Sequence, residues 1–277
     1  MQLVGFSPNG NRVHFVRDLT EEEIAKHKKY TAIFAEARGR FHLFKILSRN
    51  YEEWISYINF LLNPLSKNDE NDMLQLDRLL LNYLSSAYTT HEHLKASFRR
   101  RFRKTPAKLK DYDNFMTALC EKSWEFAFLL DFRGYVQHCG LGISQFNRQT
   151  SLTSVTVHIS CDAEQLFTNS REWKKSKLTG KEGTIEIAPI LQEFHHRMLE
   201  SYGGYVAKMF FPELTPAAKF YSGLTSEVKK IGKDFGIFFT NKPDVKTEGD
   251  KQTMNLTFSR VPNDLFAELG ISVSLKE

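Results

Sequence analysis

Arg133 and His138 are the two residues whose chemistry stands out in this sequence. Both lie near the end of FAFLLDFRGYVQHCGLGI, residues 126–143, the most apolar helical stretch of the chain. Arg133 follows Leu129 by four residues and Phe126 by seven, so on a helix it interrupts a stripe that is otherwise apolar. A buried arginine is costly unless an opposite charge meets it. The pattern therefore predicts an arginine that meets an anion or a partner subunit.

The two side chains suit the cleavage of RNA without a metal ion. Such cleavage requires a base that activates the ribose 2′-OH and cationic donors that stabilise charge on the phosphate. Histidine titrates near neutral pH, and arginine offers phosphate a planar pair of donors. The spacing alone is weak evidence, because residues five apart are about 140° apart on an ideal helix. The structural alternative is that Arg133 pairs with a carboxylate such as Asp131 and that His138 caps the helix.

A basic tract, KASFRRRFRKTPAKLK at residues 95–110, is the second candidate feature. It holds the densest positive charge of the chain, interleaved with Phe98 and Phe102. Such a tract suits the RNA backbone, with its aromatic side chains packed inward. The alternative is a solvated helix end whose cations suit the helix dipole. The predicted RNA-binding residues are Arg99, Arg100, Arg101, Arg103 and Lys104.

The remaining polar residues predict neither a metal site nor a cofactor. His91 and His93 are two residues apart, about 160° around a helix, which does not make a metal pair. Glu92 or His93 can still point toward Arg133, so both are predicted as supporting residues. The three cysteines form no CxxC motif, which argues against a disulfide framework and favours a reducing cytoplasm.

The stretch LLDFRGYVQHCGL resembles the signature of HEPN-domain proteins, helical bundles that carry an R-x4-6-H motif near the end of a long helix. The upstream stretch LLNYLSSAYTTHEHL, residues 80–94, is similar to the helix that packs beside this motif in some bacterial members. The resemblance covers about residues 20–145 and is most specific over 74–142. It implies a homodimer in which two copies of the motif form a composite, metal-independent ribonuclease site.

Carried over to this chain, the resemblance implies that Arg133 holds the scissile phosphate and that His138 handles protons. It also implies RNA as substrate, a regulatory protein as partner, and a role in phage defence or as a toxin. Family members often have a polar residue directly after the arginine, whereas Gly134 stands here. That departure favours the alternative function, a non-catalytic dimeric interaction or nucleotide-binding module.

The elements expected to position these residues are mainly helices. A hairpin is predicted over residues 2–17, with SPNGN as its turn. Thr20 and Glu23 form a capping box that opens a helix. Proline disfavours helix in the residue before it, so a break is expected at Thr105–Pro106. Helices are predicted over 21–37, 41–62, 73–104 and 108–138, with Gly140 as the C-cap of the last.

The second half of the chain mixes strands with helices. Strands are expected near 154–160, 183–188, 235–241 and 252–261, and helices near 189–211 and 217–232. RQTSLTS interrupts the patterning and suggests a boundary near 148–152. The predicted fold class is α+β, predominantly α. A β-hairpin and a HEPN-like helical bundle occupy 1–148, and a mixed α+β region occupies 149–277.

Composition and length are those of a soluble globular protein. Of 277 residues, 41% are hydrophobic and 26% are charged. No run approaches the roughly 18 apolar residues that span a bilayer, and the N-terminus lacks the pattern of a signal peptide. The net charge of +5 does not by itself identify a nucleic-acid binder. The expectation is a cytoplasmic protein without membrane association.

Overall fold

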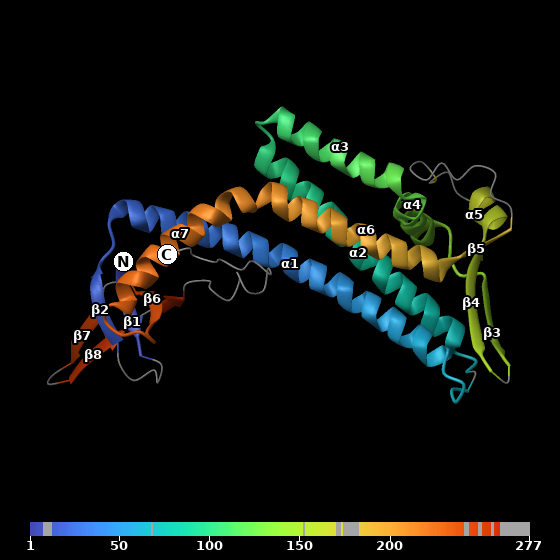
Figure 1. The fold of residues 1–277 in the computed structure, drawn as a ribbon, viewed down its shortest axis with the longest axis horizontal. Coiled ribbons are helices and arrows are strands. Elements are labelled where there is room, and N and C mark those ends of the chain that lie inside the picture. The colour runs from blue at the N-terminus through green and yellow to red at the C-terminus, as the bar shows by residue number, and fades with distance from the viewer. Residues whose placement is uncertain are drawn as a thin grey trace. The chain divides into compact units, whose positions relative to one another are not determined.

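The computed structural model describes residues 1–7, 13–67, 69–151, 153–169, 173, 183–240, 244–248, 251–255 and 258–260. Helices predominate and strands lie toward both chain ends and in the middle, so the predicted α+β class with mostly helical content is confirmed (Figure 1). The elements are β1 Gln2–Phe6, β2 Val13–Asp18, α1 Glu21–Leu61, α2 Asp72–Phe102, α3 Pro106–Lys122, α4 Trp124–His138, β3 Gln145–Thr150, β4 Val155–Asp162, α5 Ala163–Asn169, β5 Thr184–Glu186, α6 Ile187–Met209, α7 Phe211–Lys229, β6 Gly236–Thr240, β7 Asp244–Glu248, β8 Lys251–Asn255 and β9 Phe258–Arg260.

The chain divides into two compact units whose boundaries differ from the prediction. One unit combines residues 1–39 with 208–277, and the other consists of residues 40–207. The predicted boundary near 148 instead falls within β3, which pairs with β4 along its whole length. It would therefore cut a hairpin in the second unit. The polar letters of RQTSLTS were read as an interruption, but the first three of them, Arg148, Gln149 and Thr150, form the end of β3.

The unit of residues 1–39 and 208–277 is built on an antiparallel sheet in the order β2-β1-β6-β9. The predicted N-terminal hairpin is confirmed as the β1–β2 pair, while its Asn9–Gly10 turn lies outside the described residues. Helix α7 packs against β1 and β6. Central strand β1 buries Leu3 and Val4 because its neighbours on both sides and this helix exclude water.

Helix α1 begins at the predicted capping box. Thr20 Oγ1 accepts from the Glu23 backbone N–H at 3.2 Å, and Glu23 Oε2 accepts from the Thr20 backbone N–H at 2.9 Å. The prediction of two helices, over 21–37 and 41–62, is wrong, because α1 continues without a break to Leu61. Gly39, the one helix-weakening residue between them, costs a helix only about 1 kcal/mol relative to alanine.

The unit of residues 40–207 contains the helices that carry the candidate chemistry. The break at Thr105–Pro106 is confirmed, with Pro106 opening α3. The prediction of one helix over 108–138 is wrong, because Ser123 separates α3 from α4. Ser123 is extended and its Oγ accepts from the Phe126 backbone N–H at 3.1 Å. A serine N-cap therefore starts a new helix, the 15-residue α4, which ends at His138 as expected.

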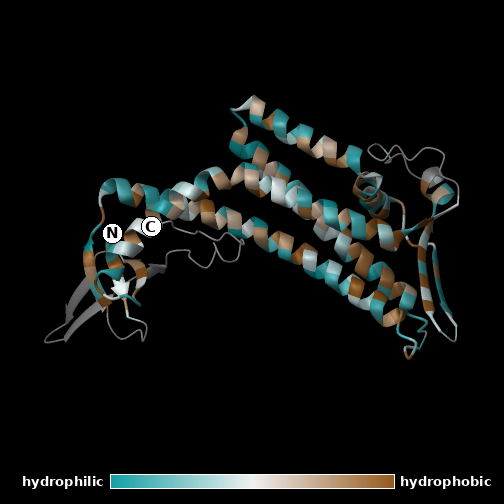
Figure 2. Ribbon diagram, viewed as in Figure 1, coloured by the Kyte–Doolittle hydropathy of each residue, from teal (hydrophilic) through white to brown (hydrophobic). Residues whose placement is uncertain are grey.

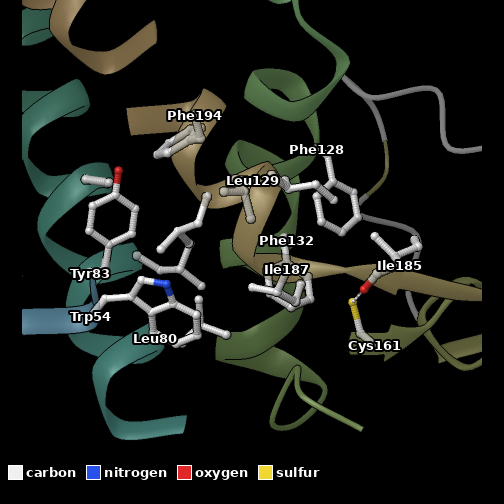
Figure 3. Packing of buried hydrophobic residues seen from close by; sticks show 14 of the residues in the cluster. Trp54, Leu80, Tyr83, Phe128, Leu129, Phe132, Cys161, Ile185, Ile187 and Phe194 are labelled. Carbon is white, nitrogen blue, oxygen red and sulfur yellow. Dashed lines mark hydrogen bonds between the residues drawn. The ribbon is translucent and has the colours of Figure 1, made fainter. Parts of the chain in front are cut away.

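The core of this unit is formed mainly by α2, α4, α6, the C-terminal part of α1 and the sheet β3-β4-β5, and Figure 3 shows Leu129 and Phe132 of α4 among its members. Cys161 of β4 is buried there, with Sγ 3.6 Å from the Ile185 carbonyl oxygen. Hydrophobic and hydrophilic residues intermingle along the helices around this core (Figure 2). Such surfaces bury one stripe and leave polar residues for the opposite side.

Of the two adjacent glycines Gly203 and Gly204, the second has a packing role. Helix α6 passes through both positions. A Cβ on Gly204 would lie 2.3 Å from Cζ of Phe115 in α3. The absence of a side chain at Gly204 thus lets α3 pack closely against α6. No described helix combines the length and apolar character that crossing a membrane requires.

Candidate functional site

Arg133 is half-buried on α4, and its guanidinium is held by an aromatic ring. Its Cζ lies 3.8 Å from the centroid of the Tyr88 ring on α2. The Nε atom is buried and has no hydrogen-bond partner among the described residues. A guanidinium stacked on a ring keeps its in-plane donors, because the ring contacts its face rather than its edge. Arg133 is therefore fixed in orientation while part of its hydrogen-bonding capacity remains unused.

His138 is exposed as the last residue of α4. The helix ends there with a hydrogen bond from the Cys139 backbone N–H to the Tyr135 carbonyl oxygen at 2.8 Å, and Gly140 follows with a φ of 149°. Because α4 stays regular through His138, Arg133 and His138 point to different sides of the helix. A single chain therefore does not bring the two predicted catalytic side chains together.

A cavity of about 770 Å³ lies between α2, α3 and α4. One wall is a row of three basic side chains on α2, His91, Lys95 and Arg99, spaced four residues apart and hence on one helix face. Tyr88, the ring under Arg133, is three residues before His91 on the same helix. The other walls come from α3 and α4: Tyr112, Asp113, Met116, Thr117, Cys120, Glu121, Trp124, Ala127 and Leu130.

Charge in this cavity is mixed and loosely paired. Arg99 Nη2 lies 3.5 Å from Asp113 Oδ1, with both side chains more than half exposed. Lys95 Nζ lies 3.5 Å from Glu92 Oε1. Ion pairs this long and this exposed contribute little to stability. The cations are therefore held near the cavity without a tight structural partner.

Tyr112 adds a polar group of a different kind to the cavity. Its side chain is buried, its ring stacks on Phe98 with centroids 4.4 Å apart, and its hydroxyl has no hydrogen-bond partner among the described residues. Burial raises the pKa of Tyr112, so the hydroxyl stays protonated at neutral pH. A buried hydroxyl without a partner costs free energy unless a ligand or water meets it.

The predicted RNA-binding tract has two environments. Arg99 reaches the cavity, whereas Arg103 and Lys104 are exposed in the turn after α2. Arg100 is exposed and Arg101 is half-buried at the last turn of the helix. Inward packing is confirmed for Phe98, which is buried, while half-buried Phe102 packs against it with its ring tilted by 50°.

The two predicted supporting residues contact other partners. His93 Nδ1 lies 2.9 Å from Arg40 Nη1 of α1. Glu92 lies 3.8 Å from His91 Nε2, beside its contact with Lys95. Neither of these contacts reaches Arg133. The aromatic partner of Arg133, Tyr88, was not singled out from the sequence, although it belongs to the same LLNYLSSAYTTHEHL stretch.

His195 of α6 is a buried polar residue that contacts other side chains of the core. Its Nδ1 lies 3.1 Å from the Tyr83 hydroxyl oxygen, and its ring stacks on Tyr51 with centroids 3.9 Å apart. Burial lowers the pKa of His195 to about 4. The imidazole is therefore neutral at physiological pH and acts as a packed, hydrogen-bonded core residue.

Within the part of the chain that the structure describes, no cluster of three or more His, Cys, Asp or Glu side chains could hold a metal ion. Comparison of the chain with protein-family models, with curated proteins and with solved structures found no match. Helices α2, α3 and α4 carry the candidate functional residues of the described chain.

Proposed function

We propose that the protein is an endoribonuclease that cleaves RNA without a metal ion, using Arg133 and His138 from two subunits in one composite site. The observation that carries the proposal is Arg133 itself. Its guanidinium is stacked on Tyr88 with a buried Nε that lacks a partner among the described residues. An oriented cation with unused donors suits a phosphodiester, since arginine matches phosphate with two parallel hydrogen bonds.

The need for a second subunit follows from the direction of the two side chains. Arg133 and His138 lie on different sides of a regular helix, so one chain cannot present both to one phosphate. A two-fold axis near the exposed end of α4 would place His138 of each chain beside Arg133 of the other. In that arrangement the site contains two arginines and two histidines.

Four such groups suffice for cleavage by the ribose 2′-OH. One imidazole takes the proton from the 2′-OH, whose oxygen then attacks phosphorus. The bond to the 5′-oxygen breaks, and the second imidazole, in its protonated form, gives that oxygen a proton. The guanidinium groups stabilise the charge that develops on the non-bridging oxygens. The products are a 2′,3′-cyclic phosphate and a 5′-hydroxyl.

The test is cleavage of labelled total RNA in EDTA by the wild type and by Arg133→Ala/His138→Ala. The proposal predicts cleavage by the wild type and none by the double variant. Arg38→Ala/His196→Ala is the matched control, because it removes the same residue types from exposed positions outside the motif. It should cleave like the wild type.

Two results would contradict the proposal. One is a wild type that cleaves no RNA and behaves like the double variant, which would favour the non-catalytic interaction module and make Gly134 the suspected cause. The other is light scattering that shows a monomer at tens of micromolar, because a monomer cannot form the composite site.

A further inference from the structure

The cavity between α2, α3 and α4 has features that the ribonuclease proposal does not use. Its basic wall, its aromatic side chains and its two carboxylates lie apart from His138, which does not line it. Its volume of about 770 Å³ is within the usual range of small-molecule sites.

We infer that this cavity binds a nucleotide, with the phosphate at Lys95 and Arg99 and the base against the apolar and aromatic residues of α3 and α4. The inference goes beyond the proposed ribonuclease activity and requires neither Arg133 nor His138.

The basic wall fits a phosphate. Lys95 and Arg99 are one turn apart on α2, and their side chains are 34% and 55% exposed. Both meet carboxylates only at 3.5 Å, longer than a charge-assisted hydrogen bond. A phosphate can therefore recruit both cations without breaking a tight ion pair.

The remaining walls fit a nucleoside better than inorganic phosphate or a purely apolar ligand. Met116, Ala127 and Leu130 provide apolar contact, and half-buried Trp124 provides an aromatic ring of the kind on which bases stack. Glu121 supplies a carboxylate that can accept from a ribose hydroxyl or an exocyclic amine. A bare anion would be repelled by this carboxylate and would leave the apolar wall unused.

Tyr112 forms a buried part of the cavity wall. It lines the cavity, is 1% exposed, and carries a hydroxyl without a partner among the described residues. A buried hydroxyl normally finds a partner. This hydroxyl oxygen has no exposed surface, so the ring of Tyr112, and not its hydroxyl, lines the cavity.

The inference is tested by titrating the full-length protein with AMP, CMP and inorganic phosphate in a calorimeter. The nucleotides are expected to bind, and Lys95→Gln/Arg99→Gln should weaken their affinity by roughly tenfold or more. Arg103→Gln/Lys104→Gln is the matched control, because it removes the same charges from the same tract outside the cavity, and its affinity should stay within about twofold of the wild type.

Two further variants keep the test valid if the charge variant folds poorly. Thr117→Trp fills the cavity from an exposed position and should also abolish nucleotide binding. Tyr112→Phe removes a hydroxyl that has no exposed surface, so it should leave nucleotide affinity close to that of the wild type and serves as a control for substitution in this wall. Arg133→Ala/His138→Ala should bind AMP like the wild type, so loss of cleavage and loss of nucleotide binding are separate outcomes.

A short oligoribonucleotide in the same titration distinguishes a free nucleotide from a nucleotide within a chain. Binding of either ligand that is lost in Thr117→Trp supports the site. The inference is overturned if no nucleotide binds, if binding survives both Lys95→Gln/Arg99→Gln and Thr117→Trp, or if inorganic phosphate binds as tightly as AMP.

Discussion

Two arginines, one in each unit, show how differently this chain uses the same side chain. Arg17 of β2 is saturated: Nε donates to Glu227 at 2.8 Å, and Nη1 and Nη2 donate to Glu23 at 2.8 and 2.7 Å. This pairing raises the pKa of Arg17 and lowers that of Glu23 to about 2. Arg133 of α4 has a ring on its face and a buried Nε without a described partner.

The comparison separates a structural cation from an available one. Arg17 ties β2 to the first turn of α1 and to α7, so its donors are consumed by the fold. Arg133 is positioned by its contact with the Tyr88 ring, which leaves N–H donors of the guanidinium without a hydrogen-bond partner among the described residues. An arginine in that condition can meet an incoming phosphate without first giving up a carboxylate.

Two histidines within residues 40–207 repeat the contrast. His195 is buried beside the Tyr83 hydroxyl and the Tyr51 ring. His138 is exposed, and no hydrogen bond or ion pair joins its side chain to other described residues. The first is suited to holding the core together, and the second is suited to exchanging protons with a substrate.

The largest expected effect comes from replacing each of the two arginines by alanine and comparing RNA cleavage with stability. Arg133→Ala should lower RNA cleavage by about 10²–10³-fold, the usual effect of removing one charge-stabilising donor. Its stability should change by no more than about 1–2 kcal/mol, the strength of a cation–π contact. Arg17→Ala should leave cleavage unchanged and lower stability by about 1–2 kcal/mol, because a partly exposed carboxylate network is lost. RNA cleavage and urea unfolding of both variants measure the two effects.

The opposite result would contradict the roles assigned to Arg133 and Arg17. If Arg133→Ala unfolds the protein and Arg17→Ala abolishes cleavage, Arg133 is the structural residue. Arg133→Lys distinguishes the two roles further, because lysine keeps the charge but cannot present a planar pair of donors.

The histidine contrast predicts a pH dependence of stability. Between pH 6.5 and about 4, the unfolded chain protonates His195 while the folded chain does not. Stability should therefore be complete above pH 6.5 and fall by about 2–3 kcal/mol as the pH decreases to 4. Urea unfolding at pH 7.5 and 4.5 checks this.

Two histidine variants test whether His195 causes this pH dependence of stability. His195→Gln should be less stable at neutral pH and should show a weaker fall between pH 7.5 and 4.5. His138→Gln should keep the wild-type fall, because its side chain is exposed. Equal pH dependence in the wild type and in His195→Gln would remove His195 as the cause.

The sequence predicted local features better than features made by several helices. The Thr20–Glu23 capping box and the proline break at 105–106 were found because each depends on residues adjacent in sequence. Burial of Arg133 was predicted from its place in an apolar stripe, and the side chain is half-buried. The break at Ser123 was missed, because an apolar run on both sides masked an N-cap serine.

The cavity could be predicted only in part. His91, Lys95 and Arg99 recur every four residues and so share one helix face, although this row was not singled out from the sequence. The residues opposite them, Tyr112 and Trp124 among others, come from α3 and α4. Their approach to α2 depends on the break at Ser123 and on helix packing, which no short motif encodes.

The smallest expected effect concerns the exposed end of the basic tract. Arg103→Gln/Lys104→Gln should bind RNA somewhat more weakly and with a lower salt dependence, each lost phosphate contact reducing the slope by roughly 0.7 for a single strand. Filter binding over a range of salt concentrations measures the slope. An unchanged slope would assign these two cations to solvated surface.

The most direct test of the central claim is the chemical identity of the RNA ends produced in EDTA by the wild type and by His138→Ala. Attack by the 2′-OH predicts 2′,3′-cyclic phosphate and 5′-hydroxyl ends from the wild type. His138→Ala should bind the same RNA with similar affinity yet produce no such ends, because the imidazole acts in the transition state rather than in ground-state binding. Ends that carry a 3′-hydroxyl, a requirement for divalent metal, or undiminished cleavage by His138→Ala would contradict a site formed by Arg133 and His138.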